Sequence, residues 1–140
     1  MAMSKEQMDQ RMDEHFGFEE RDDIEGVLGT LAEGARHDII GWPTGPTTSH
    51  EDMRQFYATL FGDLSDGKVK TIRRFYGENF LVDESEWSGK APGRPFGIEG
   101  RNRPLKFRLL HVVEFGEDTK LKSEQVWLDF PSLMAQLPQE

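Results

Sequence analysis

The second half of the chain is dominated by segments with the pattern of long β-strands joined by short turns. These segments are rich in β-branched and aromatic residues, which favour strands. We assign them to residues 69–76, 80–87, 105–115 and 120–130. The turns at 77–79 and 116–119 are short, so the strands they join are expected to pair as antiparallel hairpins. Glycine breaks among aromatic-rich strands further predict a strongly curved sheet.

The first half has the periodicity of amphipathic helices instead. Met8, Met12 and Phe16 recur at four-residue spacing and predict a helix over residues 5–16. The same reasoning gives further elements, namely a helix over 21–32, a short strand over 35–40, a helix over 53–61 capped by Ser49, and a terminal helix from Pro131. Helices followed by a strand meander predict an α+β fold, with the N-terminal helices on the concave face of the sheet.

The remaining long segment, residues 88–104, contains four glycines and three prolines. This composition predicts a loop. We find no internal repeat and no linker-like composition shift, so residues 1–140 are expected to form a single domain. A curved sheet covered by helices on one face leaves room for an enclosed pocket.

Composition narrows the function classes. The chain has 140 residues, no cysteine and a net charge of −9. An acidic surface argues against nucleic-acid partners, and the absence of cysteine excludes disulfides and thiolate metal sites. No apolar run reaches the ~18 residues of a membrane span, and the charged N-terminus lacks signal-peptide character. We therefore expect a cytoplasmic protein without a membrane or nucleic-acid partner.

Four spaced patterns in the second half resemble a known family. They read E-x-E-W-x-G from Glu84, G-x-P-F-G-I-x-G-R from Gly93, F-R-L-L-H-V-V-E-F from Phe107 and W-x-D-x-x-x-L-x-x-Q-L from Trp127. In order and spacing they resemble the SnoaL-like polyketide-cyclase group of the NTF2-like superfamily, and E-x-x-x-x-F-Y-x-x-L-F from Glu51 is compatible with it. The resemblance implies a cone-shaped α+β barrel, a pocket at its open end and homodimers formed through the outer sheet face.

That resemblance does not imply one function, because the superfamily includes cyclases, isomerases, dehydratases, epoxide hydrolases and non-catalytic binding proteins. The chain has no phosphate-binding loop, no nucleophile elbow and no HExxH motif. Its four histidines lack metal-ligand spacing. We therefore expect neither metal nor cofactor, and any chemistry would be acid–base catalysis inside an apolar pocket.

His111 is the first candidate for such chemistry. Strand alternation places it on one face with four apolar residues, Phe107, Leu109, Val113 and Phe115. A histidine on an apolar inner face can act as a general acid or base near neutral pH. The alternative is a core histidine whose nitrogens are satisfied by the backbone.

Asp129 is the second candidate. It follows Trp127 by two residues, so both are expected on one face of a strand paired with that of His111. A carboxylate beside an indole has a raised pKa and could exchange protons with a substrate. In related cyclases and epoxide hydrolases, an aspartate on the last strands has such a role. Equally, Asp129 could cap the terminal helix.

Asp83 is the third candidate, since only one of Asp83 and Glu84 can face inward. The limonene epoxide hydrolase pattern has Arg-x-Asp on this strand. Here Leu81 stands two residues before Asp83, which puts that specific activity in doubt, although Arg73 or Arg74 could substitute.

Aromatic and apolar residues complete the predicted pocket. We expect the phenols to donate hydrogen bonds to a carbonyl or enolate oxygen. The predicted substrate contacts are Trp42, Tyr57, Tyr76, Trp127, Phe107 and Leu109.

Two functions from different classes fit these observations. The first is a cofactor-free cyclase, isomerase or hydrolase acting on a small apolar molecule, with Asp129 and His111 as its acid–base pair. The second is a non-catalytic domain that binds an apolar ligand or a protein partner, and it requires that Asp129 and His111 do not converge. A third reading, a dimer with a fully packed core, requires that no cavity exists.

Overall fold

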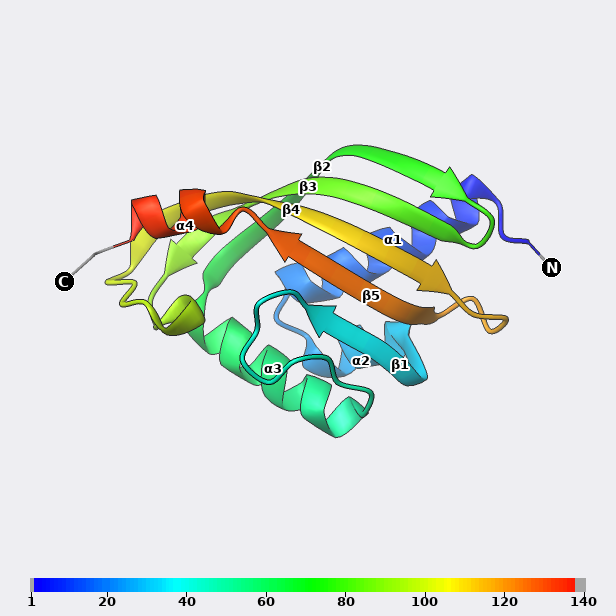
Figure 1. Ribbon diagram of the computed structural model, residues 1–140, viewed down its shortest axis with the longest axis horizontal. Coiled ribbons are helices and arrows are strands. Elements are labelled where there is room, and N and C mark those ends of the chain that lie inside the picture. The colour runs from blue at the N-terminus through cyan, green and yellow to red at the C-terminus, as the bar shows by residue number, and fades with distance from the viewer. Residues whose placement is uncertain (1, 138–140) are drawn as a thin grey trace.

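A computed structural model describes residues 2–137 and shows helices on one side of a curved sheet (Figure 1). The elements in chain order are α1 (Lys5–Glu20), α2 (Ile24–Thr30), β1 (Leu31–Ile39), α3 (His50–Asp63), β2 (Ser65–Gly77), β3 (Phe80–Ala91), the 3-10 helix η1 (Pro95–Gly97), β4 (Arg103–Phe115), β5 (Leu121–Leu128) and α4 (Phe130–Gln136). The predicted α+β class is confirmed.

The five strands form one sheet in the order β1-β5-β4-β3-β2. The predicted antiparallel meander is confirmed for β2 to β5, whereas β1 runs parallel to β5. The sheet is therefore mixed and open, not wholly antiparallel. The reason lies in chain connectivity: after β1 the chain passes through α3 and starts β2 at the opposite edge, and β1 pairs with the last strand.

Several element boundaries differ from the sequence predictions. The strand β3 continues to Ala91, because Ser88 to Ala91 pair with Lys106 to Arg103 of β4. The predicted loop of residues 88–104 is thereby shortened. Likewise, α1 continues through Gly17 to Glu20, where burial of its apolar face outweighs the weak helix propensity of glycine.

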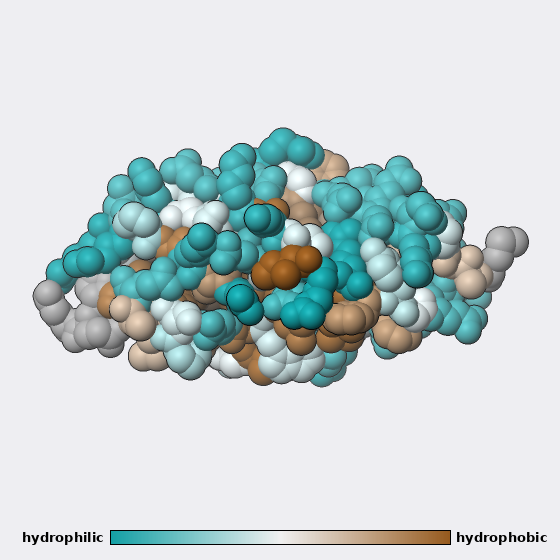
Figure 2. All heavy atoms as spheres, turned by 90° about the horizontal axis from the view of Figure 1, so that it is seen from above, coloured by the Kyte–Doolittle hydropathy of each residue, from teal (hydrophilic) through white to brown (hydrophobic). Residues whose placement is uncertain are grey.

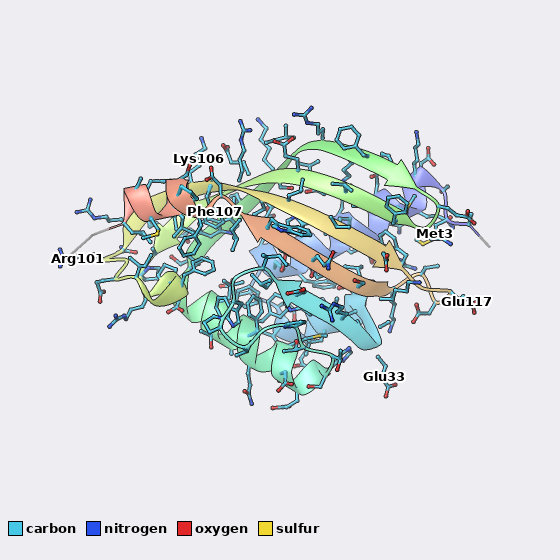
Figure 3. The ribbon with its side chains drawn as sticks, in the orientation of Figure 1. Met3, Glu33, Arg101, Lys106, Phe107 and Glu117 are labelled. Atoms are coloured by element: carbon cyan, nitrogen blue, oxygen red, sulfur yellow. The ribbon has the colours of Figure 1, made fainter. Side chains whose placement is uncertain are left out.

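The main core lies between the concave face of the sheet and helices α1 to α3. Met8, Met12 and Phe16 are buried as their spacing predicts. The Ser49 side chain caps α3 by accepting a hydrogen bond from the Asp52 amide at 3.1 Å. On β4, Phe107 is buried in the interior and its neighbour Lys106 points away (Figure 3). In residues 2–137, no helix has the length and apolarity needed to cross a membrane.

Candidate active site

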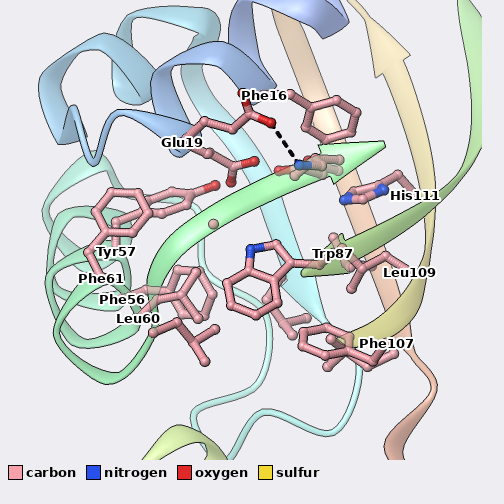
Figure 4. A pocket seen from close by; sticks show the side chains of 18 of the residues that line it. Phe16, Glu19, Phe56, Tyr57, Leu60, Phe61, Trp87, Phe107, Leu109 and His111 are labelled. Atoms are coloured by element: carbon pink, nitrogen blue, oxygen red, sulfur yellow. Dashed lines mark hydrogen bonds between the residues drawn. The ribbon is translucent and has the colours of Figure 1, made fainter. Parts of the chain in front are cut away.

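A cavity of about 100 Å3 lies between the concave sheet face and the helices (Figure 4). Its walls are mostly aromatic and aliphatic, and they include Phe107 and Leu109 of β4, as strand alternation predicts. Polar side chains enter this apolar space from two sides. One of them is His111 on the sheet, and the others come from α1, α3, β1 and β5.

On the sheet side, His111 faces the cavity with Asp83 behind it. The two residues are directly opposite each other on β4 and β3, and the His111 Nδ1 atom lies 3.6 Å from the Asp83 Oδ1 atom. The imidazole also packs edge-on against the Phe16 ring, with 5.0 Å between centroids. Because Nδ1 is directed at the carboxylate, Nε2 is the nitrogen available to a molecule in the cavity.

Asp83 is fully buried but well supplied with donors. Its carboxylate accepts hydrogen bonds from Arg74 Nε at 2.7 Å, from Thr71 Oγ1 at 3.0 Å and from the Ser85 hydroxyl. Burial raises the pKa of Asp83, but the adjacent His111 and hydrogen bonds from Ser85 and Arg74 outweigh burial and hold that pKa at about 2. Asp83 is therefore ionised at neutral pH. We call these five residues the sheet cluster.

On the helical side, a second buried polar group surrounds Glu124 of β5. Its carboxylate lies 3.2 Å from His15 Nε2 and 3.5 Å from His37 Nε2. Burial raises the pKa of Glu124, but the adjacent charge of His15 lowers that pKa to about 2. Burial lowers the pKa of His15, whereas the Glu124 and Glu19 carboxylates raise it, to about 9 overall.

The hydrogen bonds of His15 independently support its positive charge. Thr30 donates its only hydroxyl proton to the Val27 carbonyl at 2.6 Å, so Thr30 must accept from His15 Nδ1 at 2.7 Å. The other ring nitrogen faces the carboxylates of Glu124, at 3.2 Å, and Glu19, at 3.7 Å. A proton on Nδ1 together with two carboxylates in front of Nε2 favours the doubly protonated ring, which agrees with the raised pKa of His15 and makes Glu124 its counter-ion.

Tyr57 and Glu19 extend this buried group to the cavity. The Tyr57 hydroxyl lies 3.2 Å from His37 Nε2, and Tyr57 and Glu19 both line the cavity. Figure 4 shows their polar ends directed toward each other, with His111 on the β4 wall. Burial raises the pKa of Glu19, although the charge of His15 opposes it. Glu124, His15, His37, Tyr57 and Glu19 are called the helix-side cluster below.

A second pocket, of about 370 Å3, adjoins the first beside α3. Trp42 lies in its wall and packs edge-on against Phe56 at 4.8 Å. His37, Ile39 and Phe56 line both pockets and so separate them. Trp42 thus borders the neighbouring pocket, not the cavity that contains His111.

The structure separates two predicted site residues from the rest. Asp129 caps α4, with its carboxylate accepting from the Ser132 amide at 3.3 Å and from the Ser132 hydroxyl at 2.7 Å. Trp127 is 40% exposed on the outer face of the sheet. The expectation that both share a face with His111 is corrected by the register, which pairs His111 with Val126.

The physical reason for that correction is an irregularity in the β4–β5 hairpin. The register shifts between Glu114 and Phe115, so alternation counted from the turn assigns the wrong face to β5. Tyr76 also lies outside the cavity wall, where its hydroxyl donates to Asp9 at 2.7 Å. Tyr57 and His111 do line the cavity, and their contact with a substrate stays a prediction.

Sequence reasoning missed the helix-side cluster except for Tyr57. A signal for Glu124 existed, since it alternates with Val126 and Leu128 on β5 once the register is known. His15 adjoins the apolar stripe of α1 but is polar and so was left out. Within residues 2–137, no group of three or more His, Cys, Asp or Glu side chains is arranged to hold a metal ion.

Comparison with solved structures supports the fold. A proposed SnoaL-like polyketide cyclase from Jannaschia sp. CCS1 is similar with a TM-score of 0.84 and 13% identity, covering 99% of both chains. AclR from Streptomyces galilaeus, a proposed hydroxylase, is similar with a TM-score of 0.79 and 13% identity; the match covers 94% of this chain and 96% of AclR. An LEH-like epoxide hydrolase of M. tuberculosis is similar with a TM-score of 0.72 and 12% identity; the match covers 94% of this chain and 89% of the hydrolase.

A search of curated proteins gave no match. The model of the SnoaL-like polyketide cyclase family, in contrast, matches residues 6–137, nearly the whole chain. This match agrees with the fold, with the concave pocket and with the spaced patterns of the second half. The chain belongs to the SnoaL-like polyketide cyclase family.

Proposed function

We propose that the protein is a cofactor-free enzyme that moves a proton on a small apolar carbonyl compound, with His111 as the general base. The observation that carries this proposal is the Asp83–His111 pair at the wall of an apolar cavity. Asp83 replaces Asp129 as the partner of His111, because Asp129 is occupied as a helix cap.

The role of each group follows from its environment. The ionised Asp83 carboxylate only accepts hydrogen bonds, so it favours the tautomer of His111 with the proton on Nδ1. That leaves the Nε2 lone pair for the cavity. An aspartate that fixes a histidine tautomer in this way also stabilises the imidazolium formed when the base takes a proton. Asp83 is therefore a positioning residue and His111 the residue that contacts substrate.

The proposed proton transfer needs no co-reactant. His111 Nε2 takes a proton from the carbon next to a carbonyl, and the C–H electron pair forms a carbon–carbon double bond. The carbonyl π electrons move to oxygen and produce an enolate. The His111 imidazolium then returns the proton to carbon, at the same or a conjugated position. Ring closure by attack of the enolate carbon on a second carbonyl starts from the same intermediate.

The comparisons are compatible with this range of chemistry. Similar structures are described as a polyketide cyclase, a hydroxylase and an epoxide hydrolase, and they share the fold at 12–13% identity. These names concern those proteins. For this chain, proton transfer from carbon is favoured because His111 lies in an apolar part of the cavity wall and the lining residues include no serine or cysteine nucleophile.

The proposal can be tested without knowing the natural substrate. We would incubate the protein with small cyclic ketones such as 2-indanone in D2O and follow loss of the α-proton signals by NMR. Exchange should be accelerated by the wild type and fall ~10²–10⁴-fold in His111→Gln, the usual contribution of a general base. Accelerated exchange that survives this substitution would exclude the role given to His111. Ligand binding without exchange would favour the non-catalytic alternative.

We also propose that the chain forms homodimers through the outer face of the sheet. Phe75, Leu110 and Trp127 are 60%, 39% and 40% exposed there, and the register places them on one face. Figure 2 views the molecule from above Figure 1 and shows apolar side chains at the centre of a mainly hydrophilic surface. Leu110→Glu should convert a dimer into a monomer in light scattering, whereas a wild-type monomer would exclude this interface.

A further inference from the structure

The cavity is lined by more acidic side chains than its apolar walls require. Four acidic residues contribute to the lining, namely Glu19, Glu20, Asp22 and Glu124. Among the described residues, the lining contains no lysine or arginine. Glu19 and Glu20 lie in the last turn of α1, although the C-terminal end of a helix is already negative. Such departures from favourable helix electrostatics are typical of functional sites.

The buried carboxylates outnumber the cations that face them. His15 Nε2 lies 3.2 Å from Glu124 Oε2 and 3.7 Å from Glu19 Oε2, so one imidazolium faces two carboxylates. Burial lowers the pKa of His37, so this ring adds no second positive charge at neutral pH. Tyr57 directs its hydroxyl toward Glu19 (Figure 4), but a phenol is neutral at this pH. The helix-side cluster therefore has one positive charge too few.

One buried oxygen of this cluster also lacks a hydrogen-bond donor. Glu124 is 2% exposed and lies on the inner face of β5 with Val126 and Leu128, and all three line the cavity. The Glu124 Oε1 atom is 3.5 Å from His37 Nε2, but within the described chain it accepts no hydrogen bond. A buried ionised oxygen without a donor needs a partner, and a bound cation can supply one.

The pKa of Glu19 changes in the direction that a missing cation predicts. Burial raises this pKa and the Glu124 charge adds to the effect, whereas the His15 charge opposes it. The Glu19 side chain is 21% exposed, which makes it more accessible than His15 and Glu124. A cation in the cavity would favour the ionised form of Glu19 and bind together with it.

Aromatic rings form most of the remaining wall. They come from the helices and from the sheet and surround the space from both sides (Figure 4), as Phe16, Tyr57, Phe61, Trp87 and Phe107. The face of an aromatic ring attracts a cation, and that of tryptophan attracts it most strongly. Several rings together are a typical binding site for quaternary ammonium groups, whose charge is covered by alkyl carbons. The walls therefore suit an organic cation.

The acidic residues at the rim extend the negative charge to the surface. Glu20 and Asp22 are exposed and line the cavity beside Val69 of β2. Glu20 accepts a hydrogen bond from the Val69 amide at 2.7 Å, which holds its carboxylate at this rim. Arg21 lies over the Phe18 ring instead, 5.0 Å from its centroid. A negative rim concentrates cations near the opening and disfavours anions.

We propose that the cavity binds a small organic cation, namely a quaternary or protonated tertiary ammonium group with apolar substituents. Glu19 and Glu124 compensate its charge, and the rings of Tyr57 and Trp87 contact its alkyl groups. The volume of about 100 Å3 limits this group to a compact size, since an engineered cavity of ~150 Å3 holds one benzene ring.

The cation site also narrows the substrate class of the proposed reaction. There the ammonium group belongs to an amino ketone whose α-carbon lies near His111 Nε2. This extension rests on the proposed function, whereas binding of the cation itself does not depend on catalysis.

Choline and 3,3-dimethylbutan-1-ol test the inference, because the alcohol has the shape of choline with carbon in place of the charged nitrogen. In isothermal titration calorimetry, the wild type should bind choline at least ~10-fold more tightly than the alcohol. Glu19→Gln keeps the size of the side chain but removes its charge, so this preference should disappear. Glu6→Gln makes the same change at an exposed position ~20 Å away along α1 and should keep the preference.

The outcomes separate this inference from the proposed function. Equal affinity of the folded wild type for the two ligands, failure to bind choline, or a choline preference that survives Glu19→Gln would each overturn the cation site. His111→Gln should keep the choline preference while losing ketone exchange. If the wild type prefers choline but exchanges no ketone, the cation site stands and the proposed function fails. If it exchanges 2-indanone without preferring choline, the proposed function stands and the cation site fails.

Discussion

The sheet cluster and the helix-side cluster each contain a buried carboxylate and border the same cavity, but the charge of that carboxylate is compensated differently. Asp83 in the sheet cluster is paired with Arg74, which also contacts Asp9 at 2.9 Å and Asp13 at 2.8 Å near the surface. Glu124 in the helix-side cluster is paired with His15, whose side chain is fully buried. An arginine keeps its charge at any accessible pH, whereas a histidine does not.

This difference predicts that the two clusters have different roles. The permanent charge of Arg74 keeps Asp83 ionised, and the carboxylate in turn fixes the tautomer of His111. The side chains of His15 and Glu124 are 0% and 2% exposed, so each depends mainly on the charge of the other. We therefore expect substitutions in the sheet cluster to affect activity most. Substitutions of His15 and Glu124 in the helix-side cluster should affect stability most.

The largest expected effect is on activity in the sheet cluster. Asp83→Asn should lower ketone exchange by ~10²-fold or more, because an amide can donate to Nδ1 and so favour the wrong tautomer of His111. The free energy of unfolding should fall by only about 1–3 kcal/mol, since Arg74 retains Asp9 and Asp13. NMR exchange rates and urea unfolding measure the two effects separately. Unchanged exchange in a folded Asp83→Asn protein would remove the positioning role.

The next effect is on stability in the helix-side cluster. Glu124→Gln leaves the His15 cation without its counter-ion, and breaking a buried pair in this way costs about 3–5 kcal/mol. Glu114→Gln, at an exposed position on β4, is the matched control and should change stability by less than ~0.5 kcal/mol. Urea denaturation at pH 7 compares them. Equal midpoints for the two variants would contradict a buried ion pair.

The pH dependence of stability should identify the same pair. His15 has a pKa of about 9 in the folded protein and 6.5 as its ordinary value, so its contribution is complete below pH 6.5 and is lost as pH rises toward 9. The loss is on the order of 3 kcal/mol for a shift of this size. Asp83→Asn should keep this slope in urea unfolding measured from pH 6 to 10, and Glu124→Gln should abolish it.

On the acid side the two clusters should behave alike. The pKa values of Asp83 and Glu124 are both lowered to about 2, so each contributes stability above its ordinary pKa, near 4, that disappears as pH falls toward 2. Only the alkaline limb therefore distinguishes the clusters. Loss of stability above pH 7 in Glu124→Gln equal to that of the wild type would assign the slope to another group.

The smallest expected effect concerns Asp129, which caps α4 and which the sequence also suggested as a helix cap. Asp129→Ala should destabilise the protein by about 0.5–2 kcal/mol through loss of its hydrogen bonds to Ser132. Ketone exchange should stay at the wild-type rate, because the carboxylate does not reach the cavity. Thermal unfolding and the NMR assay give both values. A large loss of exchange in a stable Asp129→Ala protein would return Asp129 to the catalytic site.

Local patterns in the sequence were sufficient for much of the fold. The four-residue spacing of Met8, Met12 and Phe16 predicted the buried face of α1, and strand alternation placed His111, Phe107 and Leu109 on the inner face of β4. Such patterns succeed because burial of one face repeats with the period of the element itself. The same patterns predicted the α+β class. Together with the spaced motifs, they indicated the SnoaL-like family.

Only the tertiary structure decided which polar groups meet. One register shift at Glu114 and Phe115 turned Trp127 outward and Val126 inward, and no periodicity within β5 records that shift. The helix-side cluster draws Glu124, His15, His37, Tyr57 and Glu19 from four elements that are far apart in the sequence. The sequence by itself determined the elements and their apolar faces, because those depend on neighbours a few residues away. The pairing of buried charges depends on distances between elements, and these exist only once the sheet has curved around the helices.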